Sequence, residues 1–87
     1  MVSKKVIVVN KQGIHARPAG ELAKICKNCK SETVLLVGER VINPKSVLNI
    51  MAAAMRCGTE ITVQCDGENE KEELEMLVKA IESGLGE

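Results

Sequence analysis

The stretch VIVVNKQGIHARPA, residues 6–19, carries the local signals from which the fold can be read. It opens with four consecutive β-branched residues, Val6–Val9, which favour a strand. The polar run Lys11-Gln12-Gly13 then interrupts the pattern. Pro18 follows at a place where the first turn of a helix accepts a proline without losing a hydrogen bond. The stretch therefore predicts a strand, a glycine turn and the beginning of a helix.

The predicted helix continues past Pro18, because apolar residues keep a helical spacing there. They recur at i, i+3, i+4 and i+7, which places them on one face. These residues are Ala19, Leu22, Ala23 and Cys26.

A β-hairpin is expected next in the chain. Thr33–Val37 and Arg40–Ile42 read as strands, and the dipeptide Gly38-Glu39 separates them. Glycine at the first position of a two-residue loop favours a type II′ turn, because that position needs a positive φ. Pro44 ends the second arm of the hairpin, since proline has no amide hydrogen for a strand ladder.

A short second helix and a fourth strand follow the hairpin. Ser46 is a good N-cap for a helix over Val47–Met55, and Gly58 is placed to end it in the left-handed conformation. The segment Ile61–Cys65 then alternates between apolar and polar residues, as a half-buried strand does. Its inward positions are Ile61, Val63 and Cys65, and its outward positions are Thr62 and Gln64.

The last element is the clearest helix of the chain. Asn69 and Glu72 have the spacing of a capping box, and glutamates crowd the first turn, where the helix dipole favours negative charge. Gly84 is placed to end the helix. Its apolar stripe consists of Leu74, Leu77, Val78 and Ile81.

The order of elements, βαββαβα, predicts one domain over residues 1–87 with an α/β two-layer sandwich. One sheet is expected to carry three helices on one face. The chain contains no Phe, Tyr or Trp. Aliphatic residues, methionines and cysteines must therefore fill the core.

Charge and hydropathy exclude several classes of function. Twelve basic and twelve acidic residues balance, so no overall field favours nucleic acid, and the aromatic residues that stack on single strands are absent. The apolar runs, Val6–Val9 and Ile50–Met55 among them, are too short for a bilayer span or a secretory signal. We expect a cytoplasmic protein with reduced thiols, without membrane insertion or direct binding of nucleic acid.

His15, the only histidine, stands where the glycine turn meets the predicted helix. Its imidazole is nucleophilic near neutral pH. The first amides of the helix, at Ala16 and Arg17, can face an anion beside the ring, and the Arg17 guanidinium suits phosphate oxygens. These features permit a phosphohistidine, but a polar side chain beside a helix cap explains the same pattern. A metal site is the weaker reading, because His15 has no obvious partner ligands nearby.

A resemblance to a known family favours the first of these readings. The run GIHARPA, residues 13–19, resembles the active-site signature of the HPr family, the histidine-containing phosphocarriers of the bacterial sugar phosphotransferase system. The segment KSVLNIM, residues 45–51, is similar to the regulatory serine segment of Gram-positive-type members. The resemblance covers nearly the whole chain and implies an open-faced antiparallel sheet of order 1-4-2-3.

The resemblance also implies how the chain works. Phosphorylated enzyme I would donate a phosphoryl group to Nδ1 of His15, and sugar-specific IIA proteins or domains would accept it. Arg17 would help hold and release the group, while Pro18 would help fix the turn. The chain would be a carrier without a cofactor or metal, not an enzyme. Lys11-Gln12 replaces the small polar or acidic residues often found there in the family, which could alter the local attraction of anions.

Ser46 has a structural and a regulatory interpretation. As an N-cap it needs no further function, but the resemblance implies modification by a serine kinase/phosphorylase. A phosphate at Ser46 would add negative charge beside an expected docking patch of Val47, Leu48 and Met51, which would hinder transfer from enzyme I. The resemblance implies a second role for the modified surface, in which it binds a catabolite-control transcription regulator as a corepressor.

Cys26 and Cys29 have the C-x-x-C spacing of some redox and metal sites. On a helix the same spacing places both side chains on one face, where they serve equally well as small core residues. Because no second close cysteine pair accompanies them, the core interpretation is preferred.

Overall fold

The computed structural model describes residues 1–87 and contains one antiparallel sheet of four strands. The strand order is β1-β4-β2-β3, which confirms the predicted order 1-4-2-3. The strands are β1 over Val2–Ile7, β2 over Glu32–Val37, β3 over Arg40–Ile42 and β4 over Glu60–Asp66.

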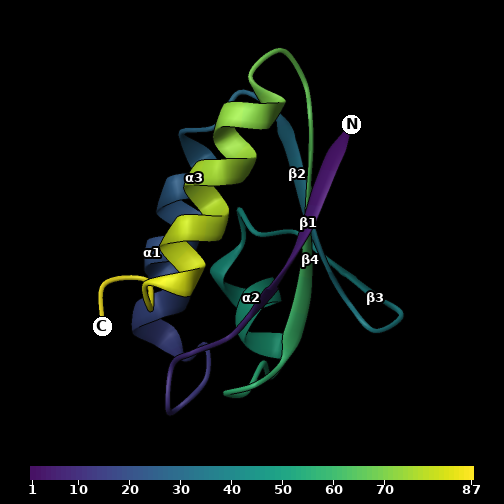
Figure 1. Ribbon diagram of the computed structural model, residues 1–87. Helices are drawn as coiled ribbons and strands as arrows, with labels where there is room; N and C mark the ends of the chain where they lie inside the picture. Colours follow the sequence, from purple (N-terminus) through teal and green to yellow (C-terminus); the bar gives the residue numbers. More distant parts are fainter.

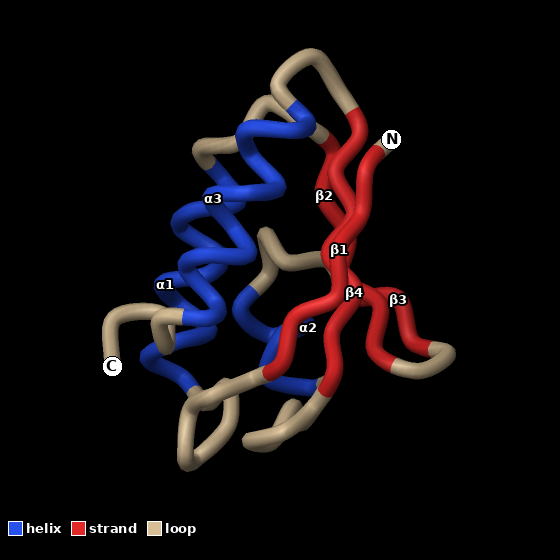
Figure 2. The backbone as a smooth tube through the Cα atoms, in the orientation of Figure 1, coloured by secondary structure: helices blue, strands red, loops and turns tan.

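Three helices cover one face of this sheet and leave the other bare (Figures 1 and 2). They are α1 over Ala16–Lys27, α2 over Val47–Ala52 and α3 over Glu70–Glu82. The element order is βαββαβα, as predicted. The two-layer open sandwich is therefore confirmed.

The core lies between the sheet and the helices and consists of 21 buried apolar residues in one cluster. The predicted faces of α1 and α3 are buried in it. In β4 the inward positions Ile61, Val63 and Cys65 are buried, and the alternation is confirmed. The hairpin turn is also confirmed, since Val37 pairs with Arg40 and Gly38 has a φ of +60°.

The first strand begins earlier than the predicted Val6–Val9. The observed β1 pairs with β4 from Val2 opposite Cys65 to Ile7 opposite Glu60. The polar residues 3–5 belong to the strand because their backbone pairs with β4. They lie at the edge of the sheet, where charged side chains are well tolerated. Val8 lies beyond the strand, but it stays buried in the core.

Helix α2 ends earlier than the predicted Met55. It stops at Ala52, and Ala54, with a φ of +50°, takes the left-handed position expected of Gly58. This early end lets Met55 enter the core and lets its carbonyl accept the Ile14 N–H at 2.9 Å.

The predicted N-cap at Ser46 is confirmed, whereas the prediction of a capping box at Asn69 is wrong. Ser46 Oγ accepts the Asn49 N–H at 3.2 Å, but the Asn69 side chain makes no cap hydrogen bond. Glutamates of the first turn of α3 bind other segments instead. Glu73 accepts the backbone N–H groups of Lys30 and Ser31 at 2.8 and 2.9 Å. Long-range hydrogen bonds replace the local cap here.

Candidate functional site

The turn between β1 and α1 is held against the segment that follows α2. Gly13 has a φ of +73°, and a Cβ at this position would collide with the Met55 carbonyl oxygen. The adjacent Ile14 is buried and donates its N–H to that same oxygen. Only glycine combines this φ with such a close backbone approach. The position of His15, one residue later, is therefore set by tertiary contacts.

His15 is the N-cap residue of α1, but its side chain does not cap the helix. Its carbonyl accepts the Ala19 N–H at 2.9 Å, while the ring is 39% exposed. The N–H groups of Ala16 and Arg17, at the first two helical positions, have no acceptor within the helix. The half-exposed ring therefore stands beside the positive end of α1.

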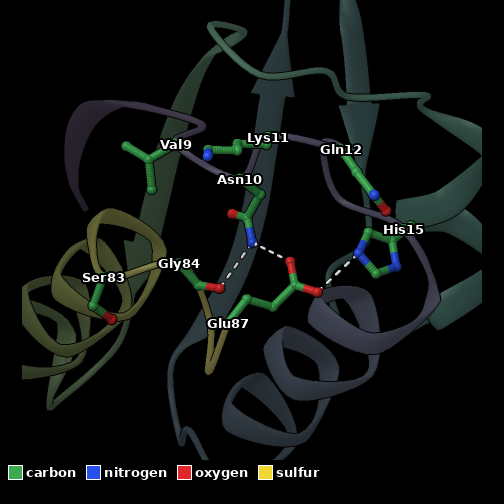
Figure 3. Close-up of a pocket in the computed structure, with 8 residues that line it drawn as sticks. All are labelled: Val9, Asn10, Lys11, Gln12, His15, Ser83, Gly84 and Glu87. Atoms are coloured by element: carbon green, nitrogen blue, oxygen red, sulfur yellow. Dashed lines mark hydrogen bonds and ion pairs between the residues drawn. The ribbon is translucent and has the colours of Figure 1, made fainter.

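A carboxylate from the end of the chain contacts the ring (Figure 3). Glu87 Oε2 lies 2.9 Å from Nε2 of His15. The other oxygen, Oε1, accepts a hydrogen bond from Asn10 Nδ2 at 2.7 Å, and the same amide donates to the Gly84 carbonyl at 2.8 Å. The contact leaves Nδ1 as the ring nitrogen not engaged by the carboxylate.

The pKa of Glu87 is lowered from its ordinary value. The largest cause is the hydrogen bond from Asn10, which stabilises the charged form. Desolvation opposes this effect, while the nearby charges of His15 and Arg17 lower the pKa further. Glu87 is therefore an anion at neutral pH and faces His15 and Arg17 with a full negative charge.

A polar depression of about 450 Å³ opens beside the ring. Its walls come from the β1–α1 turn and from the segment after α3, which are distant in sequence (Figure 3). Val9 is its only apolar residue; the others are Asn10, Lys11, Gln12, His15, Ser83, Gly84 and Glu87. Such a wall suits a small charged group better than an apolar ligand.

The predicted docking patch lies on α2. Leu48 is 79% exposed and Met51 is 42% exposed, whereas Val47 is half-buried against the core. Ser46 is half-buried at the beginning of this helix, and its hydroxyl is engaged by both the backbone and the side-chain N–H of Asn49. Two of the three predicted patch residues thus form an exposed apolar surface.

The cysteines are thiols, and three of the four are buried. Cys26 and Cys29 face the core, and burial raises the pKa of Cys26 to about 12 and also raises that of Cys29. A thiol that resists ionisation is a poor nucleophile. Both residues therefore have the environment of core side chains.

Sequence reasoning missed Asn10 and Glu87. Asn10 is buried directly after the first apolar run, where a polar residue signals a specific hydrogen-bonding role. Glu87 carries no comparable signal, because it is one of many acidic residues and lies 72 positions from His15. Only the packing of α3 against the sheet brings the end of the chain to the ring.

The chain resembles known proteins over nearly its full length. Residues 2–83 match the family described as PTS HPr component phosphorylation site. The phosphocarrier protein HPr of Mycoplasma capricolum is 38% identical over 77 residues, 88% of this chain and 86% of that protein. The HPr-like protein Crh of Bacillus subtilis is 35% identical over 82 residues, 94% of this chain and 96% of Crh.

Solved structures agree with these relatives. The crystal structure of HPr from Thermoanaerobacter tengcongensis superposes with a TM-score of 0.93 at 30% identity, covering 100% of this chain and 98% of that one.

None of the helices of the present structure has the length and apolar character needed to cross a membrane.

Proposed function

The chain belongs to the HPr family of phosphotransferase-system components, and from this premise we propose that His15 accepts a phosphoryl group on Nδ1. Phosphorylated enzyme I is the donor, and sugar-specific IIA proteins or domains are the acceptors. The observation that supports this assignment is the position of the ring. It is half-exposed at the N-terminus of α1, and Nδ1 remains free of the Glu87 carboxylate.

The surroundings of His15 suit a mobile phosphate. The N–H groups of Ala16 and Arg17, at the N-terminus of α1, can donate hydrogen bonds to the phosphate oxygens, as the amides of helix N-termini commonly do. Arg17 is exposed and makes no ion pair shorter than 4 Å, so its guanidinium is available to balance the dianion. Pro18 is buried in the first turn of α1 and helps to fix these amides.

The transfer itself needs little from the protein beyond position and charge. The Nδ1 lone pair of His15 forms a bond to phosphorus, and the bond to the donor breaks with its electron pair left on the donor. The reverse sequence delivers the group to the acceptor, because an imidazole is a good leaving group. His15 is thus a stoichiometric intermediate in the cytoplasm, and the chain is a carrier that needs no cofactor or metal.

A patch of Val47, Leu48 and Met51 is the proposed docking surface for these partners. Its exposed side chains belong to α2, and the segment after α2 is tied to the site turn through the Met55–Ile14 hydrogen bond. A partner that covers the patch is therefore held close to the turn that carries His15. Apolar side chains of this kind supply affinity when they are desolvated.

Regulation through Ser46 is the second candidate function. Ser46 caps α2 next to the exposed Leu48, and a phosphate at a helix N-terminus is compatible with the fold. Similarity to the HPr-like protein Crh favours such a role. A serine kinase/phosphorylase would modify Ser46, and the modified surface would bind a catabolite-control transcription regulator as a corepressor.

Labelling with phosphoenolpyruvate and enzyme I tests the carrier function. The wild-type chain is expected to take up one phosphoryl group that is lost in acid and retained in base, as a phosphohistidine is. His15→Ala should remain unlabelled, while Ser46→Ala should label normally and serve as the control. Labelling of His15→Ala at the wild-type level would refute the proposal.

A further inference from the structure

We propose that Asn49 slows the phosphorylation of Ser46, because its side-chain amide occupies the lone pair with which the serine oxygen would attack a phosphoryl donor. The inference rests on the proposed regulatory phosphorylation of Ser46 and adds a residue of this chain that sets its rate. Asn49 is a positioning residue in this role, since it acts through the hydroxyl that reacts.

Two hydrogen-bond donors converge on the Ser46 hydroxyl oxygen. The backbone N–H of Asn49 lies 3.2 Å from Oγ, and Nδ2 of the same side chain lies 3.1 Å from it. The backbone contact is the ordinary hydrogen bond of a serine N-cap. The contact from the side chain is additional, because the cap is complete without it.

The side chain of Asn49 turns to the hydroxyl because the usual partner at this spacing is already engaged. In a capping box, a side chain three residues after the N-cap accepts the backbone N–H of the N-cap residue. Here the Ser46 N–H donates to the Asn43 carbonyl at 3.2 Å. The Asn49 amide therefore donates to Oγ instead of accepting from the backbone.

The reaction of a serine kinase needs one lone pair of the hydroxyl oxygen. That lone pair forms the bond to the γ-phosphorus of ATP, and the hydroxyl proton passes to a base of the kinase. The bond between this phosphorus and the bridging oxygen breaks, and its electron pair leaves with ADP. A hydroxyl oxygen has two lone pairs, and in Ser46 both accept hydrogen bonds from Asn49. One of these hydrogen bonds must break before Oγ can attack.

The bond that breaks is the one from the side chain. The backbone N–H of Asn49 is held in place by α2, whereas the side chain is exposed and can turn into solvent. A hydrogen bond between uncharged groups in such a position makes a small net contribution. We therefore expect its removal to raise the rate of phosphorylation about two- to fivefold. Asn49 slows the reaction without preventing it.

Single-turnover phosphorylation of the full chain by the HPr serine kinase/phosphorylase with ATP tests this role. A series of kinase concentrations gives the maximal rate and the concentration needed for half of it. Asn49→Ala removes the amide and places a good helix former in α2, so the maximal rate should rise about two- to fivefold at an unchanged half-saturating concentration.

Leu48→Ala is the contrasting variant, because it removes exposed apolar surface from the same helix and leaves both donors to Ser46 in place. It should raise the half-saturating concentration rather than the maximal rate. Asn28→Ala is the matched control, since it removes an exposed amide that bonds to α1. It should leave both quantities at their wild-type values.

Two further measurements separate this role from a general loosening of α2. In Asn49→Ala, labelling of His15 by phosphorylated enzyme I and the midpoint of urea denaturation should both stay close to the wild-type values. Nitrogen-15 NMR of the unphosphorylated chain reports the contact itself. Ser46→Ala removes the acceptor, so it should shift the resonances of the Asn49 side-chain amide.

Equal maximal rates of serine phosphorylation in wild type and Asn49→Ala would overturn the role of Asn49, as would an amide resonance that Ser46→Ala leaves in place. A faster reaction accompanied by a lower urea midpoint or slower labelling of His15 would also overturn it, since both indicate a loosened helix. Absence of phosphate on Ser46 in wild type and variants alike would instead overturn the proposed regulation, and the NMR result would still report on the contact.

Discussion

At the scale of single residues, Asn10 stabilises the charged form of the Glu87 carboxyl. Its amide is buried, and one of its two hydrogen bonds goes to the Glu87 carboxylate. A neutral side chain therefore lowers the pKa of the carboxyl group that contacts His15. The lowered pKa of Glu87 is the measurable sign of this contact.

Asn10→Ala is expected to raise the pKa of Glu87 toward its ordinary value, because the largest stabilising hydrogen bond of the anion is removed. In the wild type the contact of the Glu87 carboxylate with His15 is complete at any pH above the ordinary glutamate pKa. It is lost only as the pH falls through the lowered pKa of Glu87. In the variant the loss should occur at higher pH. Carbon-13 NMR titration of the Glu87 carboxyl measures its pKa in the wild type and in the variant.

Asn28→Ala is a suitable control for this titration, since Asn28 is exposed and its amide hydrogen bond lies on the far end of α1. It should leave the Glu87 curve unchanged. Coincident curves for wild type and Asn10→Ala would show that the carboxylate is not held by the amide.

At the scale of elements, two short connections determine what the site presents. The glycine turn places His15 at the beginning of α1, and the early end of α2 leaves Met55 free to receive the turn. Neither connection is stabilised by local propensity alone. The glycine turn can be tested by comparing alanine substitutions at two glycines, both with positive φ, of which only Gly13 lies against another backbone segment.

Gly13→Ala should lower the free energy of unfolding by about 2–4 kcal/mol, because a side chain there has both a positive φ and a collision with the Met55 carbonyl. Gly58→Ala is the matched control. Gly58 has a φ of +91° with no atom within 4 Å of an added Cβ, so we expect only about 1 kcal/mol. Urea denaturation measures both, and equal losses would contradict the collision.

Ser46→Asp should slow transfer from enzyme I while leaving stability near that of the wild type. Aspartate caps a helix about as well as serine does, but its charge must be desolvated when a partner covers Leu48 and Met51. Quenched-flow labelling and urea denaturation measure the two effects. Ser3→Asp, which adds the same charge on exposed β1, is the control; equal transfer rates for both variants would argue against a docking surface at α2.

At the scale of the whole molecule, α3 connects distant parts of the chain. Its first turn binds the connection between α1 and β2 through Glu73, and the segment after its last turn reaches His15 through Glu87. The Ser31 hydroxyl also donates to Glu73, and this hydrogen bond is the main cause of the lowered pKa of that carboxyl. The helix thus supports the fold at one end and the site at the other.

Glu73→Ala is expected to lower the free energy of unfolding by about 1–3 kcal/mol at neutral pH, because it leaves the Ser31 amide and hydroxyl without their acceptor. Since the folded pKa of Glu73 is lowered, its contribution is complete above the ordinary glutamate pKa and disappears as the pH falls through the lowered one. Wild type and variant should therefore converge in acid. Glu75→Ala, on an exposed position of α3, should cost little at any pH.

The pattern of apolar residues, together with the proline, glycine and cap residues between the runs, predicted the elements and the buried faces of α1, β4 and α3. The stripe of α3 and the alternation of β4 follow from helical and strand periodicity, which are local properties of the backbone. The motif around His15 and the N-cap at Ser46 were also readable, since both depend on neighbours within a few residues. What could not be read were the ends of β1 and α2 and the failed cap at Asn69. Partners distant in sequence, namely β4, Ile14 and the α1–β2 connection, decide these features.

The same division holds at the site. The chain order placed a nucleophile, a helix N-terminus and Arg17 together, because they are consecutive residues. The pairing of Glu87 with Nε2, and the Asn10 amide that orients it, arises only when α3 packs on the sheet and returns the last residues to the first turn (Figure 3). Contacts across 72 and 77 positions leave no periodic trace in a sequence, so the tertiary structure alone determined them.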